Sequence, residues 1–229
     1  MKKLITVVIL LASLTSCASV GPRHTILGTT YGFPASDLID ILLDAQVGQL
    51  RVRHVRMKAS CGSGYADHLE LFGPIGPDST AAIERIIPTM HKCMNGTRWI
   101  VNTIFMSSGG GLMSDGFELG RIFRENEMQT VITGGQSCAS SCAIAFLGGK
   151  FRRMEFDAEI LFHAPYRAGR YSIDCSDTGQ VAQLRNYYQG QMGDSDGEFL
   201  LARTMSYCSS TDGWTLNADA AKLFNITTQ

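Results

Sequence analysis

Three short segments of the chain carry residue types that could act together in nucleophilic acyl chemistry. The first is a glycine run at residues 108–111, the second contains the adjacent serines Ser140 and Ser141, and the third ends at His163. Each follows a short apolar run typical of a strand, so each is expected at the carboxyl end of a strand in a parallel sheet, where such sheets place their sites. Backbone amides, a hydroxyl and an imidazole would then face one pocket. That set predicts a serine peptidase-like site.

Each segment also has a purely structural interpretation. Free amides at the start of a helix can bind an oxyanion or a phosphate, or bind nothing. The Walker phosphate-binding pattern is absent because Phe151 follows Gly149-Lys150, and no GxGxxG fingerprint occurs here. The two serines could simply cap the helix that follows them, and a single histidine at the end of a buried strand is usually a hydrogen-bonded core residue. Only the combination of the three segments points to catalysis.

The N-terminus has the pattern of an export signal. Lys2 and Lys3 precede an apolar run over residues 4–14, which is too short to span a bilayer. The run ends in Leu-Thr-Ser-Cys at residues 14–17, which resembles the lipobox of bacterial lipoproteins, so residues 1–17 are predicted to be a lipoprotein signal peptide with Cys17 as the lipidation site. Ordinary secretion with cleavage nearby is the alternative. We expect a lipid-anchored protein of the bacterial cell envelope that faces the periplasm, with the outer membrane favoured because Ala18 follows.

Cysteine usage agrees with export. Six cysteines remain after the predicted leader, and an even number in an exported chain predicts disulfides, although the sequence does not fix their connectivity. The favoured pairs each bracket one helical segment or lie one helical turn apart: Cys61 with Cys93, Cys175 with Cys208, and Cys138 with Cys142. Zinc is the rival for such a cluster, but neither a CxxC pair nor an HxxxH pattern accompanies it, so no metal is predicted.

Composition bounds the remaining possibilities. The chain has 229 residues, 45% of them apolar, and a net charge of −1, which gives no electrostatic reason to expect a nucleic-acid partner. Residues 18–35 are rich in Gly, Thr, Ser and Pro and are predicted to be a tether, and residues 36–229 are predicted to form one domain. The basic run at Arg51, Arg53, His54, Arg56 and Lys58 is expected to lie mostly on a solvated strand face.

Hydrophobic periodicity predicts alternating strands and helices after residue 50. Strands are expected at 50–57, 68–72, 99–106, 129–133 and 158–163. Helices are expected at 36–47, from residue 78 or 79 to a kink at Pro88, at 112–123, at 139–147, around 181–188, at 199–205 and at 218–224. Gly116 and Gly120 should lie on the packed face of the helix at 112–123, and residues 190–197 should interrupt the helical pattern between 188 and 199. Strands and helices alternating at this spacing predict an α/β fold with a mostly parallel sheet flanked by helices.

The same segments resemble the proteolytic subunit of the Clp protease. Residues 108–111 (SGGG) followed by Gly116 are similar to its Ser-Pro-Gly-Gly segment and later glycine. Gly135-Gln136, Ala139-Ser140-Ser141, Gly149 and Arg152 look like its nucleophile segment, and residues 163–165 (HAP) resemble its His-Gln-Pro. Residues 216–224 (LNADAAKLF) are similar to its closing Leu-Ser-Ala-Glu-Glu-Ala-Lys-Glu-Tyr. The resemblance covers about residues 68–226 and extends to exported Clp-like proteins of the wider Clp and crotonase superfamily.

This resemblance implies a Clp/crotonase-like ββα superhelix and a role for each matching residue. Ser140 would be the nucleophile and His163 the general base, with the amides of Gly110 and Ser141 forming the oxyanion hole. The third catalytic position matches poorly: Asp212 lies one residue out of register, with Gly213 in the matching place. Asp174 or Asp177 could substitute, or the site could work as a dyad.

The leading hypothesis is therefore a cell-envelope serine hydrolase, a Clp-like peptidase without a cofactor and without an ATP-driven partner, acting on short or unfolded peptides. Self-association into a homo-oligomer is implied by resemblance alone. The departures at Cys138 and Cys142 leave open a non-catalytic lipid-anchored binding or scaffold module with a degenerate site. A crotonase-type acyl-CoA enzyme is disfavoured by export, and a Ser–Lys dyad would have to use Lys150.

Overall fold

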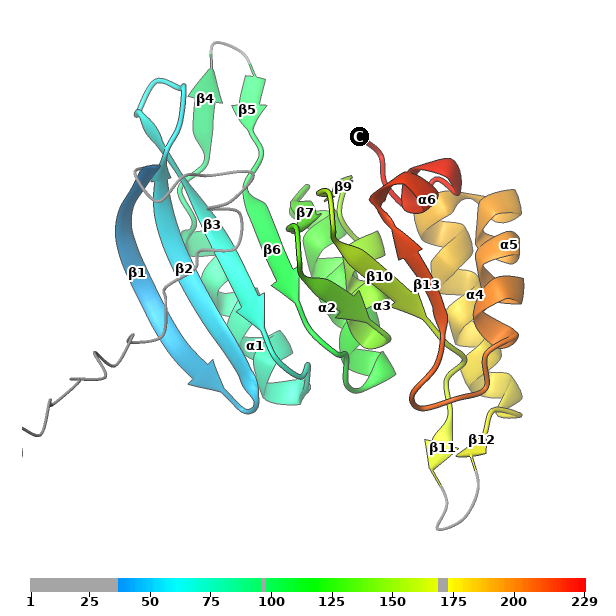
Figure 1. Cartoon of the computed structure of the whole chain (residues 1–229). Coiled ribbons are helices and arrows are strands. Elements are labelled where there is room, and N and C mark those ends of the chain that lie inside the picture. Colours follow the sequence, from blue (N-terminus) through cyan, green and yellow to red (C-terminus); the bar gives the residue numbers. More distant parts are fainter. Residues whose placement is uncertain (1–36, 96–97, 169–172) are drawn as a thin grey trace, which may run out of the picture.

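The computed structural model describes residues 37–95, 98–168 and 173–229, so the predicted leader, Cys17 and nearly all of the tether lie outside the described residues. The described chain is an α/β fold with two main sheets (Figure 1). The larger sheet has the strand order β1-β2-β3-β6-β7-β9 and the smaller one the order β13-β10-β8. Their strands are β1 (Leu38–Val47), β2 (Leu50–Lys58), β3 (Tyr65–Phe72), β6 (Thr103–Ser107), β7 (Gln129–Ile132), β9 (Phe151–Met154), β8 (Ser137–Ala139), β10 (Glu159–Phe162) and β13 (Trp214–Asn217).

The middle of the larger sheet is parallel. Strands β3, β6, β7 and β9 pair in parallel, whereas β1, β2 and β3 form an antiparallel meander. In the smaller sheet β8 and β10 are parallel and β13 is antiparallel to β10. Two short hairpins stand apart, β4 (Cys93–Asn95) with β5 (Arg98–Ile100) and β11 (Arg167–Ala168) with β12 (Ile173–Asp174). The predicted α/β architecture with a mostly parallel sheet is confirmed.

Six α-helices complete the described chain: α1 (Pro77–Ile86), α2 (Met113–Glu125), α3 (Ser141–Leu147), α4 (Thr178–Met192), α5 (Asp194–Met205) and α6 (Ala218–Leu223). A 3₁₀ turn, η2 (Ile87–Thr89), contains Pro88 at the end of α1, which is where the sequence predicts a kink. Helix α3 contacts β6 and β7 of the larger sheet as well as β8 and β10 of the smaller one, so it lies between the two sheets.

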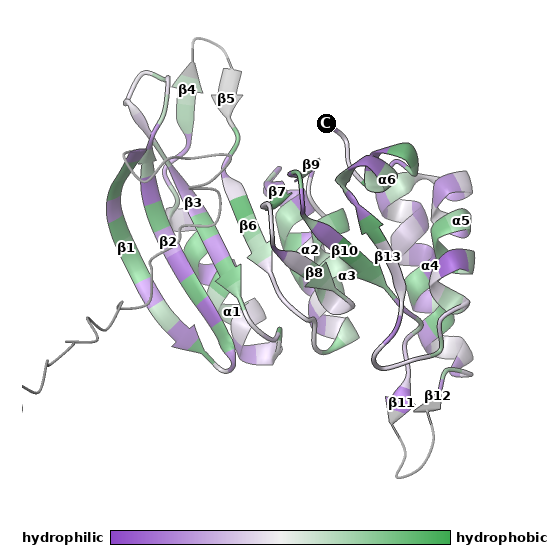
Figure 2. Cartoon of the chain, viewed as in Figure 1, coloured by the Kyte–Doolittle hydropathy of each residue, from purple (hydrophilic) through white to green (hydrophobic). Residues whose placement is uncertain are grey.

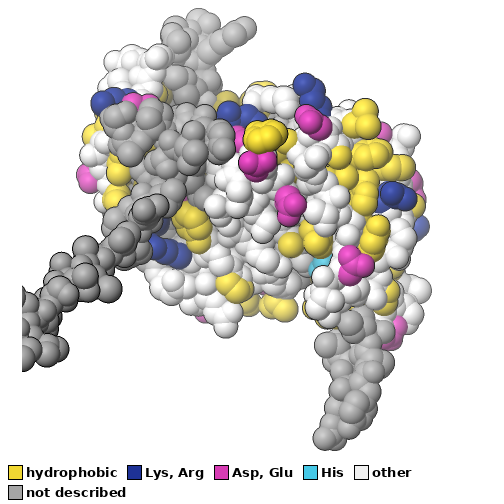
Figure 3. Space-filling model, viewed as in Figure 1, with side chains coloured by type: hydrophobic (Ala, Val, Ile, Leu, Met, Phe, Trp, Pro, Cys, Tyr) yellow, Lys and Arg dark blue, Asp and Glu magenta, His cyan; other side chains and the backbone are white. Residues whose placement is uncertain are grey.

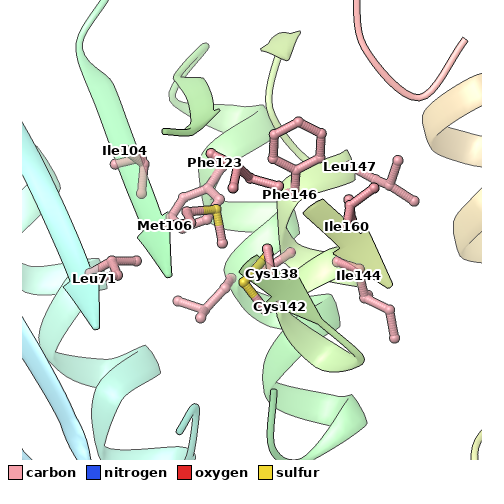
Figure 4. Close-up of a cluster of buried hydrophobic side chains, with 14 of the residues drawn as sticks. Leu71, Ile104, Met106, Phe123, Cys138, Cys142, Ile144, Phe146, Leu147 and Ile160 are labelled. Atoms are coloured by element: carbon pink, nitrogen blue, oxygen red, sulfur yellow. A yellow bond between two sulfur atoms is a disulfide. The ribbon is translucent and has the colours of Figure 1, made fainter. Parts of the chain in front are cut away.

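The core is built around α3. All seven of its residues are buried, as expected for a helix that is almost entirely apolar around its circumference. Figure 4 shows its side chains Ile144, Phe146 and Leu147 among those of Met106 and Phe123 from the neighbouring elements. Along β2, by contrast, hydrophobic and hydrophilic residues alternate (Figure 2). The segment that follows the paired serines is therefore the most deeply buried helix of the domain.

Glycines on α2 permit the close approach of α2 to α3 that the sequence predicts. A Cβ atom at Gly116 would lie 2.6 Å from the carbonyl oxygen of Ser141, and one at Gly120 would collide with the hydroxyl of Tyr187. Real Cβ atoms do not approach backbone atoms this closely. Small residues at these two positions therefore fix how near α2 lies to the helix that begins at Ser141.

The prediction of a helix over residues 36–47 was wrong, because this segment forms strand β1. Its apolar residues recur at helical spacing, but a tight turn at Gly48, with φ of 59°, lets the segment pair with β2 as a hairpin. Irregularities in the β1–β2 register at Leu38/Asp40 and at Ile41/Leu43 break the two-residue period. Strand pairing here overrides a local pattern that favours a helix.

Other boundaries also differ from the predictions. The helix predicted over 139–147 begins at Ser141, and Ala139 ends the strand β8. The predicted strand 99–106 is divided into β5 and β6, and the predicted break over 190–197 is a single residue, Gly193. Strands β9 and β13 were not predicted. The basic run is only partly solvated: Arg53 is 2% exposed and pairs with Glu70 at 2.6 Å, and His54 is buried near Asp67. None of the helices in the described part of the chain is long and apolar enough to cross a bilayer.

Candidate active site

Ser140 occupies a strained turn between β8 and α3. Its φ of 58° and ψ of −123° lie outside the regions that L-residues favour. Such a conformation costs about 1–3 kcal/mol and persists only where the surroundings fix it. The Ser140 amide donates to the carbonyl of Leu161 at 2.9 Å, and the Ala139 amide donates to the carbonyl of Ser108 at 2.9 Å. Both neighbouring strand segments thus hold the turn and lift Ser140 above the sheet, as in a nucleophile elbow.

The two adjacent serines have different surroundings. Ser141 is completely buried and its hydroxyl has no hydrogen-bond partner among the described residues, because it faces the glycine surface of α2. Ser140 is half-buried and lines a pocket. Of the pair, only Ser140 presents its hydroxyl where a substrate could reach it.

His163 lies immediately after β10 and lines the same pocket as Ser140. Its Nδ1 lies 2.9 Å from the carbonyl oxygen of Ala164, and since a carbonyl can only accept, Nδ1 carries the proton. The Ala164 amide in turn donates to the carbonyl of Tyr207 at 2.9 Å. In the neutral ring this hydrogen bond leaves Nε2 as the nitrogen that can accept a proton, as a general base requires.

The pocket that joins Ser140 to His163 is otherwise apolar. Its free space is about 20 Å³, enough for about one water molecule. The remaining lining residues come from α2, α3, β10, the segment after β10, and α4: Met113, Ile144, Phe162, Pro165, Leu184 and Tyr188. No hydrogen bond joins Ser140 to His163 among the described residues, and catalytic hydrogen bonds often tighten only when substrate binds.

The two amides predicted to form an oxyanion hole, those of Ser141 and Gly110, both lie at this turn but differ in their hydrogen bonding. Ser141 is the first residue of α3, so its amide belongs to the helix N-terminus, whose amides lack intrahelical partners. The amide of Gly110 donates to the hydroxyl of Ser108 at 3.0 Å. Gly110 has φ of 101°, and a Cβ there would lie 2.7 Å from the Cβ of Ser140. The glycine loop therefore packs directly on the Ser140 turn, and the hydroxyl of Ser108 would have to release the Gly110 amide before that amide could bind an oxyanion.

The structure does not join Asp212 to His163. Asp212 is exposed, and its Oδ1 accepts from the Gly213 amide at 2.8 Å. Of the two possible substitutes, Asp174 accepts from Ser176, and Asp177 caps α4. Across the described residues, the recorded hydrogen bonds of these carboxylates do not include the imidazole. The backbone carbonyl of Ala164 occupies the position of the third group, and a backbone atom gives no signal in the sequence.

All three expected disulfides are present: Cys61–Cys93, Cys138–Cys142 and Cys175–Cys208. Cys138 and Cys142 are fully buried and bracket the nucleophile turn, as Figure 4 shows. Cys208 directly follows Tyr207, whose carbonyl holds the segment after His163. Two of the three disulfides thus support elements that carry the candidate catalytic residues.

Other chemistries find less support in the geometry. Lys150 follows the C-terminal end of α3, whereas Ser140 precedes its N-terminal end, and Lys150 forms an ion pair with Glu127. Within the described parts of the chain, no three His, Cys, Asp or Glu side chains gather as a metal site would require. A serine acting with a histidine remains the arrangement that these side chains fit.

Comparison with known proteins found similarity at the level of the fold, among solved structures. No protein-family model matches the sequence, and no curated protein matches it. Among solved structures, a mutant of the 1510-N membrane-bound stomatin-specific protease is similar with a TM-score of 0.55 and 14% identity, covering 69% of this chain and 75% of that one. Another mutant of that protease, in complex with a substrate peptide, gives a TM-score of 0.54 at 14% identity and covers 69% and 71%.

ClpP1 from Listeria monocytogenes is similar with a TM-score of 0.51 and 17% identity, covering 70% of this chain and 88% of that one. At these identities the similarity concerns the fold alone. The chain therefore has the fold of the Clp-type proteases.

Proposed function

We propose that the protein is a serine hydrolase of the cell envelope, a Clp-like peptidase with Ser140 as the nucleophile and His163 as the general base. The observation that carries this proposal is the strained turn that holds the Ser140 hydroxyl in the same apolar pocket as an imidazole whose Nε2 is free to accept a proton. Strained backbone at a pocket is typical of functional sites. The similar structures named as proteases support the same reaction class.

The mechanism follows from the tautomer of His163. Its Nε2 takes the proton of Ser140 as Oγ attacks the scissile carbonyl carbon, and the oxyanion forms near the amides of Ser141 and Gly110. The protonated ring then gives the proton to the leaving amine, and water attacks the acyl-enzyme with Nε2 again acting as the base. Each oxyanion donor contributes about 3 kcal/mol to lowering the barrier.

Ala164 supplies a neutral acceptor to Nδ1 in place of a carboxylate. A carbonyl fixes the tautomer and the ring orientation, which are the main structural duties of the third catalytic residue. It lacks the negative charge that would stabilise the imidazolium during reaction. We expect a dyad with modest turnover, acting on short or already unfolded peptides whose small apolar side chain fits the pocket beside Ser140.

Anchoring and location are proposed from the sequence, with Cys17 as the lipid attachment point and the outer membrane favoured. Three disulfides in one domain support an oxidising compartment, because they rarely persist in the bacterial cytosol. Metabolic labelling with a palmitate analogue would test the anchor directly. We expect incorporation that Cys17→Ser abolishes, and labelling that survives this substitution would contradict it.

A homo-oligomer is also part of the proposal. Hydrophobic side chains gather over the region of α5, α6 and β13 in Figure 3, and among them Leu223 is 77% exposed and Phe199 is 43% exposed. Phe199 stacks on Phe224, so the patch is continuous. Light scattering after size exclusion should give a mass that is a multiple of the protomer mass, and a lower mass in a Leu223→Lys variant.

A fluorophosphonate probe tests the catalytic proposal because it reacts only with an activated serine. Wild-type protein should be labelled, and Ser140→Ala and His163→Ala should abolish labelling. Asp212→Asn should label within about twofold of wild type, since no hydrogen bond joins Asp212 to the imidazole. Lys150→Ala should also label normally, which would exclude the Ser–Lys dyad.

Ser137→Ala is the matched control, because Ser137 is an exposed serine three residues before the nucleophile. Labelling that persists in Ser140→Ala would assign the reactive group elsewhere. Complete failure of the wild type to label, with native circular dichroism and intact disulfides, would favour a non-catalytic module that keeps only the fold.

A further inference from the structure

A second cavity lies where the C-terminal ends of several helices meet. Its lining includes Arg124 from the last turn of α2, Gln191 from the last turn of α4 and Lys222 from the last turn of α6. Its volume is about 550 Å³, much larger than the space beside Ser140. The C-terminal ends of β6 and β10 point away from this end of the molecule, where the C-terminus of the chain lies (Figure 1). It is therefore separate from the candidate active site.

The charged side chains that line this cavity are all basic, although the last residue, Gln229, with its terminal carboxylate, lines it too. Arg124, Lys150, Arg152 and Lys222 all line it, and no Asp or Glu side chain does. Lys150 forms an ion pair with Glu127. In the described parts of the chain, no carboxylate lies within ion-pair distance of the other three cations, so the positive charge of the cavity is largely uncompensated.

Arg152 and Arg124 are held by carbonyl groups instead of carboxylates. Arg152 is buried and donates to the carbonyls of Ile226 at 2.7 Å and Asn225 at 3.3 Å. Both arginines donate to the carbonyl of Leu147, at 3.4 Å and 3.2 Å. Burial, with the positive charge of Arg124 nearby, lowers the pKa of Arg152 to about 10. Buried cations without a counter-charge are uncommon, because their desolvation is costly.

A structural role explains part of this arrangement. Basic side chains near helix C-termini satisfy the last carbonyls and the helix dipole, which accounts for the donors of Arg152. It does not account for Nη1 of Arg124, which makes no hydrogen bond with a described residue, or for Lys222, which is exposed at the end of α6. The hydroxyl of Thr227, which also lines the cavity, is buried and without a partner among the described residues. These groups are donors that a ligand could use.

We propose that this cavity binds a phosphate group, with Arg124 and Lys222 as the charged contacts and Arg152 as the fixed positive charge behind them. A phosphate supplies the counter-charge that the chain does not, and its oxygens accept from guanidinium and ammonium groups in short, charge-assisted hydrogen bonds. Helix α3 separates the cavity from Ser140, at roughly 1.5 Å per residue or about 10 Å over its length. The proposal does not depend on the hydrolase proposal, because it uses none of the same residues.

Isothermal titration with inorganic phosphate and with pyrophosphate, in chloride buffer of constant ionic strength, tests the site. We expect saturable binding with one equivalent per chain and tighter binding of pyrophosphate, which carries more charge. Arg124→Gln and Lys222→Gln should each weaken binding roughly tenfold, the equivalent of one charge-assisted hydrogen bond. Lys222 is exposed, so Lys222→Gln should fold normally. The test therefore stays informative even if Arg124→Gln fails to fold.

Lys58→Gln is the control, because it removes one positive charge from the end of β2, a different part of the surface. Absence of saturable binding, or equal weakening by Lys58→Gln and Lys222→Gln, would overturn the proposal. A lipid headgroup carries the same phosphate chemistry as a soluble ligand. Cys17→Ser protein should be tested for cosedimentation with phosphatidylglycerol vesicles. If it cosediments and Lys222→Gln abolishes this, the phosphate is that of a lipid headgroup. If the protein binds free pyrophosphate but not the vesicles, the phosphate belongs to a soluble ligand.

Discussion

Replacing Ser140 by glycine should make the protein more stable while removing its proposed nucleophile. The residue has φ of 58° and ψ of −123°, a conformation that strains any residue with a Cβ. Glycine adopts positive φ without this cost. Alanine keeps the Cβ, so Ser140→Ala should keep the strain, and the difference between the two variants isolates the backbone contribution.

The magnitude follows from two opposing contributions. Releasing the strain at Ser140 stabilises the folded state by about 1–3 kcal/mol. Glycine also has more conformational freedom in the unfolded chain, which lowers the free energy of unfolding by about 0.5–1 kcal/mol relative to alanine. The net expectation is that Ser140→Gly unfolds with a free energy about 1 kcal/mol higher than Ser140→Ala. For a domain of this size, that equals roughly 2–4 °C in Tm.

The assay is urea unfolding of both variants under non-reducing conditions, with fluorophosphonate labelling as the activity readout. Ser137 in β8 provides the matched control, because its φ is not positive and it is exposed. There the glycine variant should be the less stable of the pair by about 0.5–1 kcal/mol. If Ser140→Gly were less stable than Ser140→Ala by the same amount, the turn would store no strain, and the reasoning that links this turn to function would fail.

Three further outcomes follow from the geometry. Gly116→Ala should lower the unfolding free energy by about 1–3 kcal/mol in urea titration, because its Cβ would lie 2.6 Å from the carbonyl of Ser141; an unchanged value would mean that α2 can move away freely. Burial lowers the pKa of His68 from 6.5 to about 4, so the unfolded chain takes up a proton at this residue before the folded one does. Stability should therefore fall by roughly 3 kcal/mol as the pH drops from about 6.5 to 4, and a His68→Gln variant should lack that part of the loss. Removing the disulfide between Cys175 and Cys208, which are 33 residues apart, by a double serine substitution should cost about 3–4 kcal/mol of stability. Fluorophosphonate labelling should slow in the same variant, and labelling at the wild-type rate would show that this disulfide does not help to hold the segment after His163.

The sequence determined the parts of this protein that local chemistry specifies. Apolar runs that end in polar or glycine residues marked β6, β7 and β10, and helical spacing marked α2 and α3, because these segments bury one face or all faces in a shared core. The spacing of four residues suggested the pair Cys138 and Cys142, although in the structure Cys138 lies in β8 and only Cys142 lies in α3. The segments that hold Gly110, Ser140 and His163 could be placed together because strand ends in parallel sheets lie on one side. The resemblance to the Clp proteolytic subunit then singled out these three residues.

The tertiary structure decided what depends on distant partners. Residues 38–47 have a helical pattern of apolar residues, yet they form β1. Pairing with β2 stabilises the extended conformation by more than the helical pattern would stabilise a helix. The resemblance favoured Ser140 over Ser141, but it is the packing of α2 against α3 that buries Ser141 and leaves Ser140 at the pocket. The acceptor for the His163 ring is a backbone carbonyl, which every residue carries and no sequence motif can mark. The cationic cavity lies where α2, α4 and α6 end. Its basic residues come from α2, α6 and the segment at β9, which are far apart in the chain and meet only at this edge of the fold.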